Sequence, residues 1–389
     1  MMRPRLVHVT TTDISLALLL GPQLRAFAAA GYEVIGVSAP GPYVAQLAAD
    51  GIQHRALRHA TRSMAPARDA AALVELRRVF RDLQPDIVHT HNPKPGVYGR
   101  LAARSAHVPA VVNTVHGLYA LPDDPPAKRA LVYSLERIAS ACSDAELLQN
   151  VEDLPVLRRI GVPQHKLRVL GNGIDLERFD PQRVDAARVD VLRKEFGAEP
   201  GDVICGLVGR LVWEKGYRDV LDAARRLRDR VPNLRFAIIG PLDPDKRDAV
   251  RAADVEAAER LGNVRFLGYR DDVDECYAAM DLYVLASHRE GFPRSAMEAA
   301  AMGVPVVATD IRGCRQVVEP GVTGMLVVPR NARVLADAIE DLATREPVRA
   351  AMSVAARAKA RREFDQQRVI DITLDTYDRL LSASRNTWW

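Results

Sequence analysis

The chain of 389 residues has a hydrophobic share of 48% and a formal net charge of +4 at pH 7. Its length exceeds the roughly 250–300 residues at which a single core stops growing, so we expect two domains. The ordinary composition excludes a disordered or collagen-like chain, and no stretch reaches the ~18–20 apolar residues of a membrane-spanning helix.

Short apolar runs alternate with longer amphipathic stretches in the first half of the chain. The expected strands lie at residues 6–10, 33–38, 87–90, 110–114, 145–148 and 167–170. Helical patterns lie between them, for example at residues 15–30 and 70–83. Regular alternation of strands and helices predicts a parallel sheet with right-handed crossovers.

The second half repeats this alternation after a polar, turn-rich stretch at residues 171–200. Its expected strands lie at residues 203–208, 235–239, 264–267, 282–286, 304–308 and 324–328. Many of these runs are apolar throughout, as in strands that are covered on both faces. The sequence therefore predicts an α/β protein with two doubly wound, Rossmann-like domains, residues 1–180 and 200–364. We expect an inter-domain cleft at the carboxyl ends of the strands, where open α/β sheets bind ligands.

The loop at residues 209–216, GRLVWEKG, directly follows an expected strand and should lie at this ligand-binding edge. Arg210 and Lys215 extend from it, between two glycines that permit tight turns. A diphosphate carries roughly two to three negative charges, and two converging cations would hold it and stabilise it as it leaves. A pair of ordinary surface charges is the alternative interpretation.

Glu290 and Glu298 flank a predicted helix start in the segment REGFPRSAME, residues 289–298. Pro293 suits the first position of a helix, which places Glu298 on the helix and Glu290 in the preceding loop. Free N–H groups at the positive end of a helix are suited to a phosphate. Two carboxylates that flank such a site indicate a nucleotide sugar, with hydroxyls on both sides of a diphosphate. A solvent-facing Glu298 is the alternative.

Histidines follow two expected strands of the first half. His116 comes after the strand at 110–114 and should face the cleft, although a structural role fits its position equally well. His89 and His91 would allow metal binding at another strand end. The D-x-D pattern at Asp243 and Asp245 resembles a metal site of sugar transferases, but a turn explains it better. We find no G-x-G-x-x-G motif and no P-loop, which disfavours a dehydrogenase.

These motifs resemble those of the retaining glycosyltransferases of family four, which have the GT-B fold. Glu290 and Glu298 match the E-x7-E motif of this family, and Arg210 with Lys215 matches its diphosphate-binding pair. The segment NGID at residues 172–175 matches its inter-domain signature. The resemblance covers nearly the whole chain and is densest in the second half. The first half resembles members that extend lipid-linked glycans in exopolysaccharide or O-antigen assembly.

The resemblance implies a role for each matched residue. Glu298 would bind the ribose of the nucleotide and Glu290 the transferred sugar. Arg210 and Lys215 would bind the diphosphate. His116 falls where the family has an active-site histidine near the donor sugar and the acceptor.

Other implied features concern the backbone and the base. The donor would lie against Gly291, Phe292 and Pro293, and its base near Tyr269 and Arg270. The last helix, at residues 366–384, would cross back onto the first domain, and no cofactor or metal is expected. One departure is TTDIS at residues 11–15, where many members have a Gly-Gly pair. Phosphate contacts from the first domain therefore do not follow from the resemblance.

The predicted reaction moves a hexosyl or N-acetylhexosaminyl group from a nucleoside-diphosphate sugar, which we expect to be UDP-linked. The expected acceptor is a polyprenyl-diphosphate-linked sugar or another glycan, in surface polysaccharide synthesis. Two rival functions remain: a nucleotide-sugar epimerase on the same fold and a non-catalytic nucleotide-sugar binder. A secreted two-lobed binding protein is a third, disfavoured because Asp13 interrupts the N-terminal apolar run that a signal peptide would need.

Basic residues concentrate at residues 51–110, with ten basic and four acidic side chains, so 10 − 4 = +6. They include Arg55, Arg58, Arg62, Arg68, Arg77 and Arg78. Attraction to anionic lipid is worth about 1 kcal/mol per basic residue near the surface. An ordinary solvated surface explains the cluster equally well. If the cluster attracts lipid, we expect an acceptor at this region and an entrance shaped by residues 121–126. Trp388 and Trp389 fit an interfacial anchor and a loose terminus equally well.

Nucleic acid is not an expected partner, because no aromatic residues are interleaved with the basic cluster. The four cysteines, Cys142, Cys205, Cys276 and Cys314, are widely spaced and form no C-x-x-C pair. This spacing excludes a disulfide framework and fits a reducing compartment. We expect a cytoplasmic protein in peripheral contact with the inner face of the cell membrane.

Overall fold

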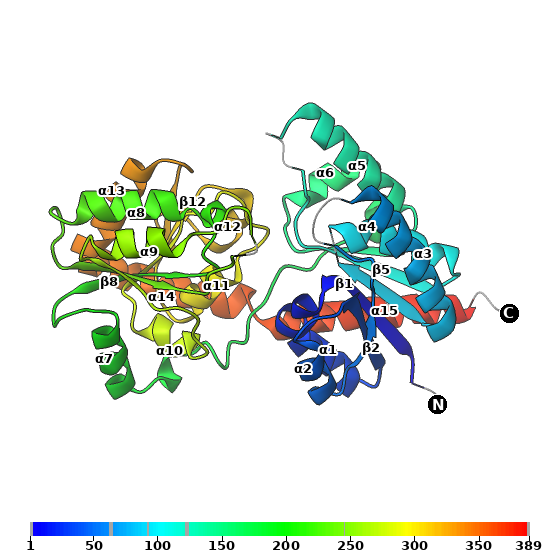
Figure 1. The fold of residues 1–389 in the computed structure, drawn as a ribbon. Helices are drawn as coiled ribbons and strands as arrows, with labels where there is room; N and C mark the ends of the chain where they lie inside the picture. The colour runs from blue at the N-terminus through cyan, green and yellow to red at the C-terminus, as the bar shows by residue number, and fades with distance from the viewer. Residues whose placement is uncertain (1–2, 62–64, 92, 121–123, 245, 387–389) are drawn as a thin grey trace. The chain divides into compact units, whose positions relative to one another are not determined.

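The computed structural model describes residues 3–61, 65–91, 93–120, 124–244 and 246–386. The chain divides into two compact units, each an α/β layer structure with helices on both faces of one sheet (Figure 1). Unit 1 comprises the residues up to 171 and those from 367 onward, and unit 2 comprises residues 172–366.

Unit 1 contains a parallel sheet with the strand order β3-β2-β1-β4-β5-β6-β7. Its strands are β1 (Arg5–Thr12), β2 (Glu33–Ala39), β3 (Gln53–Ala56), β4 (Ile87–His91), β5 (Ala110–Val115), β6 (Ala145–Leu148) and β7 (Leu167–Val169). Its helices are α1 (Gly21–Ala29), α2 (Val44–Ala49), α3 (Pro66–Leu83), α4 (Lys94–Ser105), α5 (Pro126–Ser140), α6 (Asp153–Arg159) and α15 (Gln366–Asn386). The order reverses between β1 and β4, as in doubly wound folds.

Alternate residues of the central strands of unit 1 pack against different helices. Val7 and Val88 contact α3 and α4 on one face of the sheet. Leu6 and Ile87 contact α1 and α15 on the other face. This alternation explains why the strand sequences are apolar on both faces, because a parallel sheet is covered on both sides.

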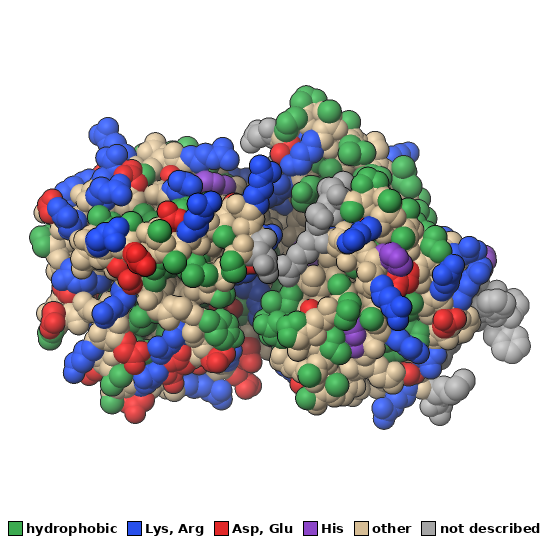
Figure 2. All heavy atoms as spheres, viewed as in Figure 1, with side chains coloured by type: hydrophobic (Ala, Val, Ile, Leu, Met, Phe, Trp, Pro, Cys, Tyr) green, Lys and Arg blue, Asp and Glu red, His purple; other side chains and the backbone are tan. Residues whose placement is uncertain are grey.

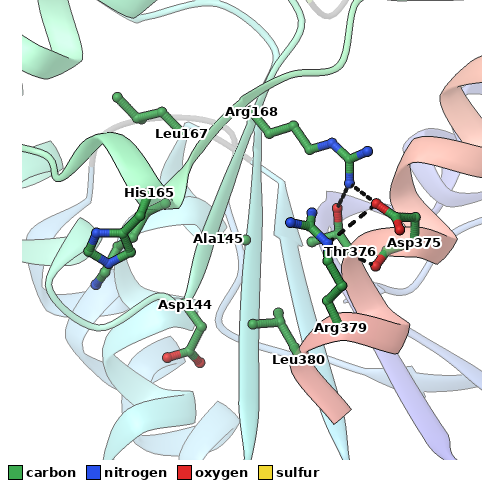
Figure 3. A pocket seen from close by; sticks show the side chains of 10 residues that line it. Asp144, Ala145, His165, Leu167, Arg168, Asp375, Thr376, Arg379 and Leu380 are labelled. Atoms are coloured by element: carbon green, nitrogen blue, oxygen red, sulfur yellow. Dashed lines mark hydrogen bonds and ion pairs between the residues drawn. The ribbon is translucent and has the colours of Figure 1, made fainter. Parts of the chain in front are cut away.

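Helix α15, drawn in red in Figure 1, belongs to unit 1 although it comes last in the chain. Arg168 at the β7 edge donates to Asp375 at 2.5 Å and to Thr376 at 2.9 Å (Figure 3). The Tyr32 hydroxyl donates to Asp378 at 3.0 Å. These contacts hold α15 beside a hollow of about 400 Å³ at the sheet edge (Figure 3).

Unit 2 contains a second parallel sheet with the order β10-β9-β8-β11-β12-β13. Its strands are β8 (Val203–Val208), β9 (Leu234–Ile239), β10 (Val264–Phe266), β11 (Leu282–Leu285), β12 (Val306–Thr309) and β13 (Gly324–Val327). Its helices are α7 (Ala186–Glu195), α8 (Tyr217–Leu227), α9 (Ala252–Glu259), α10 (Val273–Ala278), α11 (Arg294–Ala301), α12 (Arg312–Val317), α13 (Ala332–Thr344) and α14 (Glu346–Glu363). Here the order reverses between β8 and β11, which makes their carboxyl ends the expected ligand edge.

The fold class is therefore the predicted one, with two doubly wound sheets. Some elements differ in detail. The expected helix at residues 15–30 is a short π-helical turn, Ser15–Leu19, followed by α1, because Pro22 favours a fresh helix start. Strand β3 was not predicted from the sequence, because it is an exposed edge strand of polar residues without an apolar run. In the described part of the chain, no helix is both long and apolar enough to cross a bilayer.

Candidate active site

The loop after β8 carries two of the predicted site residues, Arg210 and Lys215. Residues Trp213–Lys215 form a 3₁₀ turn that ends at Gly216, which has a φ of 80°. A Cβ at Gly216 would lie 2.0 Å from the carbonyl oxygen of Ala286, just beyond β11. Only glycine therefore allows this loop to approach the end of β11 so closely.

This close approach brings Lys215 into contact with Glu290, in the loop between β11 and α11. Lys215 Nζ lies 2.5 Å from Glu290 Oε1, and the two side chains are 28% and 12% exposed. The pair is shielded enough to hold a defined geometry, yet water and a ligand can still reach it. An ammonium and a carboxylate thus lie side by side at the carboxyl edge of the sheet.

Arg210 lies at the same edge and forms an ion pair with Asp243, which follows β9. Arg210 Nη1 lies 2.7 Å from Asp243 Oδ2, and the arginine side chain is 49% exposed. Gly240 brings the two loops together, because a Cβ there would lie 1.9 Å from the carbonyl oxygen of Gly209. Asp243, the first residue of the D-x-D pattern, is thus engaged by an arginine, and Asp245 lies outside the described residues.

A pocket of about 270 Å³ opens beside Arg210 at the carboxyl ends of β8 and β9. Arg210, Tyr269 and Glu298 line it, together with Arg178 and Arg270. Three arginines and two acidic residues, Glu298 and Asp271, therefore border one hollow within unit 2. This composition suits a ligand that carries both phosphate and hydroxyl groups.

Glu298 extends into this pocket from α11, whose N-cap is Pro293. The Tyr277 hydroxyl lies 3.1 Å from Glu298 Oε2 and 3.0 Å from the carbonyl oxygen of Ser295. Burial raises the pKa of the Glu298 carboxyl above its ordinary value, although Arg294 and the Tyr277 hydrogen bond act in the opposite direction. The carboxyl is thus partly desolvated and held in place by a tyrosine, which suits it to accept hydrogen bonds from ligand hydroxyls.

The segment before α11 is fixed within unit 2. Phe292 packs edge-on against Phe364, with ring centroids 5.9 Å apart. Asn172 Nδ2 donates to the Phe292 carbonyl oxygen at 3.1 Å. These contacts set the path of Gly291, Phe292 and Pro293 between the two glutamates.

Tyr269 and Arg270 differ in their surroundings. Tyr269 is 64% exposed. Arg270 donates to both carboxylate oxygens of Asp272, at 2.7 and 2.6 Å, and to Glu195 at 2.9 Å. The Arg270 guanidinium in turn holds the pKa of the Asp272 carboxyl at about 2. Arg270 thus has acidic partners within unit 2, whereas the Tyr269 ring is presented to solvent.

His116 lies in unit 1, directly after β5. Its Nε2 atom lies 2.9 Å from His91 Nδ1, and its Nδ1 atom lies 3.1 Å from Gln149 Oε1. Burial lowers the pKa of His116 to about 4, despite the hydrogen bond to Gln149. His116 is therefore neutral at pH 7 and belongs to a buried histidine cluster.

One group of three side chains in the described residues has the composition of a metal site. His8, His89 and His91 are buried, and their ligand atoms lie within 4.8 Å of one another. The group contains no carboxylate to balance a divalent charge, and its ring nitrogens already have hydrogen-bond partners. The absence of a required metal stays a prediction.

Two residues at the site were not singled out from the sequence: Tyr277, which supports Glu298, and Arg178, which borders the pocket. Asp243, which the sequence did single out, has an arginine partner. The turn after NGID could have indicated Arg178, since it follows that signature directly. Arg62, the first half of the loop at 121–126, Trp388 and Trp389 lie outside the described residues.

Comparison with known proteins identifies the family of this chain. Residues 23–178 match the family "Glycosyltransferase Family 4", and residues 189–359 match "Glycosyl transferases group 1". The chain is 28% identical over 386 residues to a putative glycosyltransferase, EpsD, of Bacillus subtilis, with 97% of each chain covered. It is 31% identical over 273 residues, 68% of each chain, to UDP-Gal:alpha-D-GlcNAc-diphosphoundecaprenol alpha-1,3-galactosyltransferase of Escherichia coli.

The fold has a similar counterpart among solved structures. The structure of Anabaena HepE in complex with UDP and glucose matches with a TM-score of 0.79 and 20% identity, over 97% of this chain and 100% of that chain. Two family matches that together span most of both units, with a relative above 30% identity, agree with the motifs and with the two doubly wound sheets. The chain therefore belongs to the family-four, group 1 glycosyltransferases of the GT-B fold.

Proposed function

We propose that this glycosyltransferase is a retaining enzyme that transfers a hexosyl or N-acetylhexosaminyl group from a UDP-linked sugar to a polyprenyl-diphosphate-linked acceptor. The observation that carries the proposal is the pairing of Lys215 with Glu290 at the same carboxyl edge of the sheet as the pocket of Arg210 and Glu298. The donor and acceptor classes are supported by the Escherichia coli relative, whose name specifies a UDP sugar and an undecaprenol-linked acceptor.

The ion pairs at the site would exchange partners when a donor binds. Lys215 and Arg210 have carboxylate partners, Glu290 and Asp243, and a diphosphate offers both cations more negative charge. When Lys215 turns to the diphosphate, the Glu290 carboxylate can accept hydrogen bonds from the transferred sugar. The pair thus keeps both groups in place before the donor arrives.

During transfer the bond between the anomeric carbon and the phosphate breaks and negative charge grows on the diphosphate. Arg210, Lys215 and the N–H groups at the start of α11 would stabilise this charge. The acceptor hydroxyl attacks from the same face as the departing diphosphate and gives its proton to the departing phosphate oxygen, so the anomeric configuration is retained. Glu298 would hold the ribose and Tyr269 would contact the base, and no metal is needed.

A donor panel tests this proposal directly. The protein is incubated with UDP-, GDP-, ADP- and dTDP-sugars and a short polyprenyl-diphosphate-linked sugar, and the products are analysed by mass spectrometry and by NMR of the new linkage. We expect transfer from a UDP-sugar with the donor's anomeric configuration. An inverted linkage would refute the retaining mechanism. Conversion of the donor alone into an epimer, or tight donor binding without transfer, would refute transfer itself.

Peripheral membrane contact is a separate part of the proposal. Arg77, Arg78 and Arg81 are exposed on α3, and Leu131 and Ile138 are 56% exposed on α5. Figure 2 shows basic side chains over α3 and hydrophobic side chains over α5 on the visible face of unit 1. Both features favour an anionic bilayer surface, where the lipid-linked acceptor would reside.

Vesicle flotation tests the membrane contact. Binding should increase with the share of anionic lipid and decrease with salt, and the variant Arg77→Ser with Arg78→Ser should bind more weakly. Arg225→Ser with Arg226→Ser, two exposed residues of α8 in unit 2, is the matched control. Binding that is independent of anionic lipid would remove this part of the proposal and leave the transfer reaction untouched.

A further inference from the structure

A continuous row of buried polar side chains crosses unit 1, separate from the donor-binding loops of unit 2. Strands β1, β4 and β5 are neighbours in the sheet, and His8 is paired with His89 in the parallel register. His8, His89 and His91 occupy alternate strand positions and therefore face the same side of the sheet, where α1 and α15 pack. Tyr377 of α15 reaches them from that side.

Six hydrogen bonds join these side chains into one chain. In order, they are Thr114 Oγ1 to His89 Nε2 at 2.7 Å, His89 Nδ1 to Tyr377 Oη at 2.5 Å, Tyr377 Oη to His8 Nε2 at 3.3 Å, His8 Nδ1 to His91 Nε2 at 3.0 Å, His91 Nδ1 to His116 Nε2 at 2.9 Å and His116 Nδ1 to Gln149 Oε1 at 3.1 Å. Both nitrogens of all four imidazoles are engaged.

The position of each proton follows from the Gln149 end of this hydrogen-bonded chain. An amide oxygen only accepts, so His116 must donate to Gln149 Oε1 through Nδ1–H. If His116 is neutral, its Nε2 accepts from His91, and the same reasoning makes His91 accept from His8. His8 Nε2 then accepts from the Tyr377 hydroxyl.

The protons in the rest of the hydrogen-bonded chain are assigned in the same way. Because the Tyr377 hydroxyl donates to His8, its oxygen accepts from His89 Nδ1–H, and His89 Nε2 accepts from the Thr114 hydroxyl. Every bond has one proton, and every ring has its proton on Nδ1. An added proton on His91 or His116 would place two N–H groups face to face at about 3 Å, and one on His8 or His89 would face the hydroxyl proton of Tyr377 or Thr114. His8, His89 and His91 are at most 4% exposed, so water does not relieve these contacts.

We propose that Gln149, these four histidines and Tyr377 act as one directional hydrogen-bonded chain that holds His116 in one orientation and in the Nδ1–H tautomer. His116 is the least buried of the four rings and lies just after the carboxyl end of β5. The functional consequence rests on the proposed function, in which His116 contacts the donor sugar or the acceptor. Tyr377, His8, His89 and His91 are positioning residues for His116.

The chain is tested by replacing Tyr377 with phenylalanine. Tyr377→Phe removes one oxygen atom, so His8 loses its donor and His89 its acceptor while the ring remains in the core. Without this link, Gln149 still fixes the proton order of His116, His91 and His8, but His89 is no longer joined to that order and can adopt either tautomer. Tyr32→Phe is the matched control, because the Tyr32 hydroxyl bonds to Asp378 of the same helix and not to a histidine.

The measurement is long-range ¹H–¹⁵N correlation NMR of full-length protein labelled at the histidine ring nitrogens, at pH 7. Signals are assigned with single His→Gln variants. In the parent protein and in Tyr32→Phe we expect neutral Nδ1–H tautomers for all four buried histidines. In Tyr377→Phe we expect the His89 signal to become a mixture of tautomers while His116 keeps Nδ1–H, and Gln149→Glu, which can only accept, also keeps Nδ1–H on His116.

Three outcomes would overturn the proposal: a charged or Nε2–H His116 in the parent protein, an unchanged His89 in folded Tyr377→Phe, or ring shifts that change on treatment with EDTA. The last outcome would mean that a metal ion, not a chain of protons, connects the rings. In a transfer assay we expect Gln149→Leu, which removes the acceptor for the His116 Nδ1–H group, to lower kcat several-fold with an unchanged KM for the donor. If no donor supports transfer, the proposed function fails while the NMR result still decides the chain.

Discussion

Acidification should destabilise unit 1 because four neutral histidines are enclosed in its core. Burial lowers the pKa of His8 to about 3 and that of His116 to about 4. The pKa values of His89 and His91 also lie well below the ordinary value, because of burial and then of the neighbouring histidines. In the unfolded chain each histidine titrates near its ordinary pKa of about 6.5.

The sign of the effect follows from proton binding. Between about pH 6.5 and pH 4 the unfolded chain binds more protons than the folded unit, so the free energy of unfolding decreases as the pH falls. When the pH falls from about 7 to about 5.5, each histidine that stays neutral in the folded state lowers the free energy of unfolding by about 1.2 kcal/mol. Four such residues give about 5 kcal/mol, a large part of the stability of an ordinary domain.

Urea unfolding at these two pH values, combined with hydrogen–deuterium exchange, measures this loss. Peptides from β1 and β4 report on unit 1, and peptides from β8 and β11 report on unit 2. We expect the free energy of opening to fall by about 5 kcal/mol in unit 1 and by much less in unit 2. The variant His91→Gln should reduce the pH-dependent loss by about a quarter, whereas the exposed His165→Gln should not. Equal acid sensitivity of both units would refute the reasoning.

Further changes address other contacts. Lys215→Ala and Glu290→Ala should each lower kcat by about two to three decades in the transfer assay, since both remove contacts made to charge in the transition state, and Arg225→Ala should not. Gly216→Ala should impair the same step and lower the melting temperature, because a Cβ there meets the Ala286 carbonyl, and a wild-type melting curve would contradict this. Arg100→Met should destabilise unit 1 by about 3–5 kcal/mol in urea unfolding, because the Arg100 side chain is fully buried between two carboxylates that would lose their partner, and a cost below about 1 kcal/mol would contradict it.

The sequence predicted the strand-helix alternation well, since strands buried on both faces are apolar runs. It could not reveal β3, whose exposed residues Gln53 to Ala56 have no hydrophobic signal, nor the break before Gly21. Loop placement after β8 and β11 was predictable because parallel strands end at one edge. The contact between Lys215 and Glu290 was not predictable from the sequence. The two residues are 75 positions apart, and their loops come together only because β8 and β11 are neighbours in the sheet.

The contacts of the histidine cluster were still harder to predict from the sequence. His89 and His91 stand two residues apart in one strand, so the sequence alone places them on one face. His8 and His116 join them only through the order β1-β4-β5, and Tyr377 only through the path of the last helix. No local pattern connects residues 8 and 377, and the proton order can be worked out only from the assembled contacts.

The position of α15 has a consequence for synthesis on the ribosome. The strands of unit 1 emerge early, yet the helix that covers His8 and His89 is translated only after the whole of unit 2. During synthesis, the apolar face of unit 1 that α15 covers therefore stays exposed for more than half of the translation time. Translation pauses within unit 2, or chaperones that recognise exposed β1 and β4, should consequently affect the yield of this protein more than that of a chain whose domains are each contiguous.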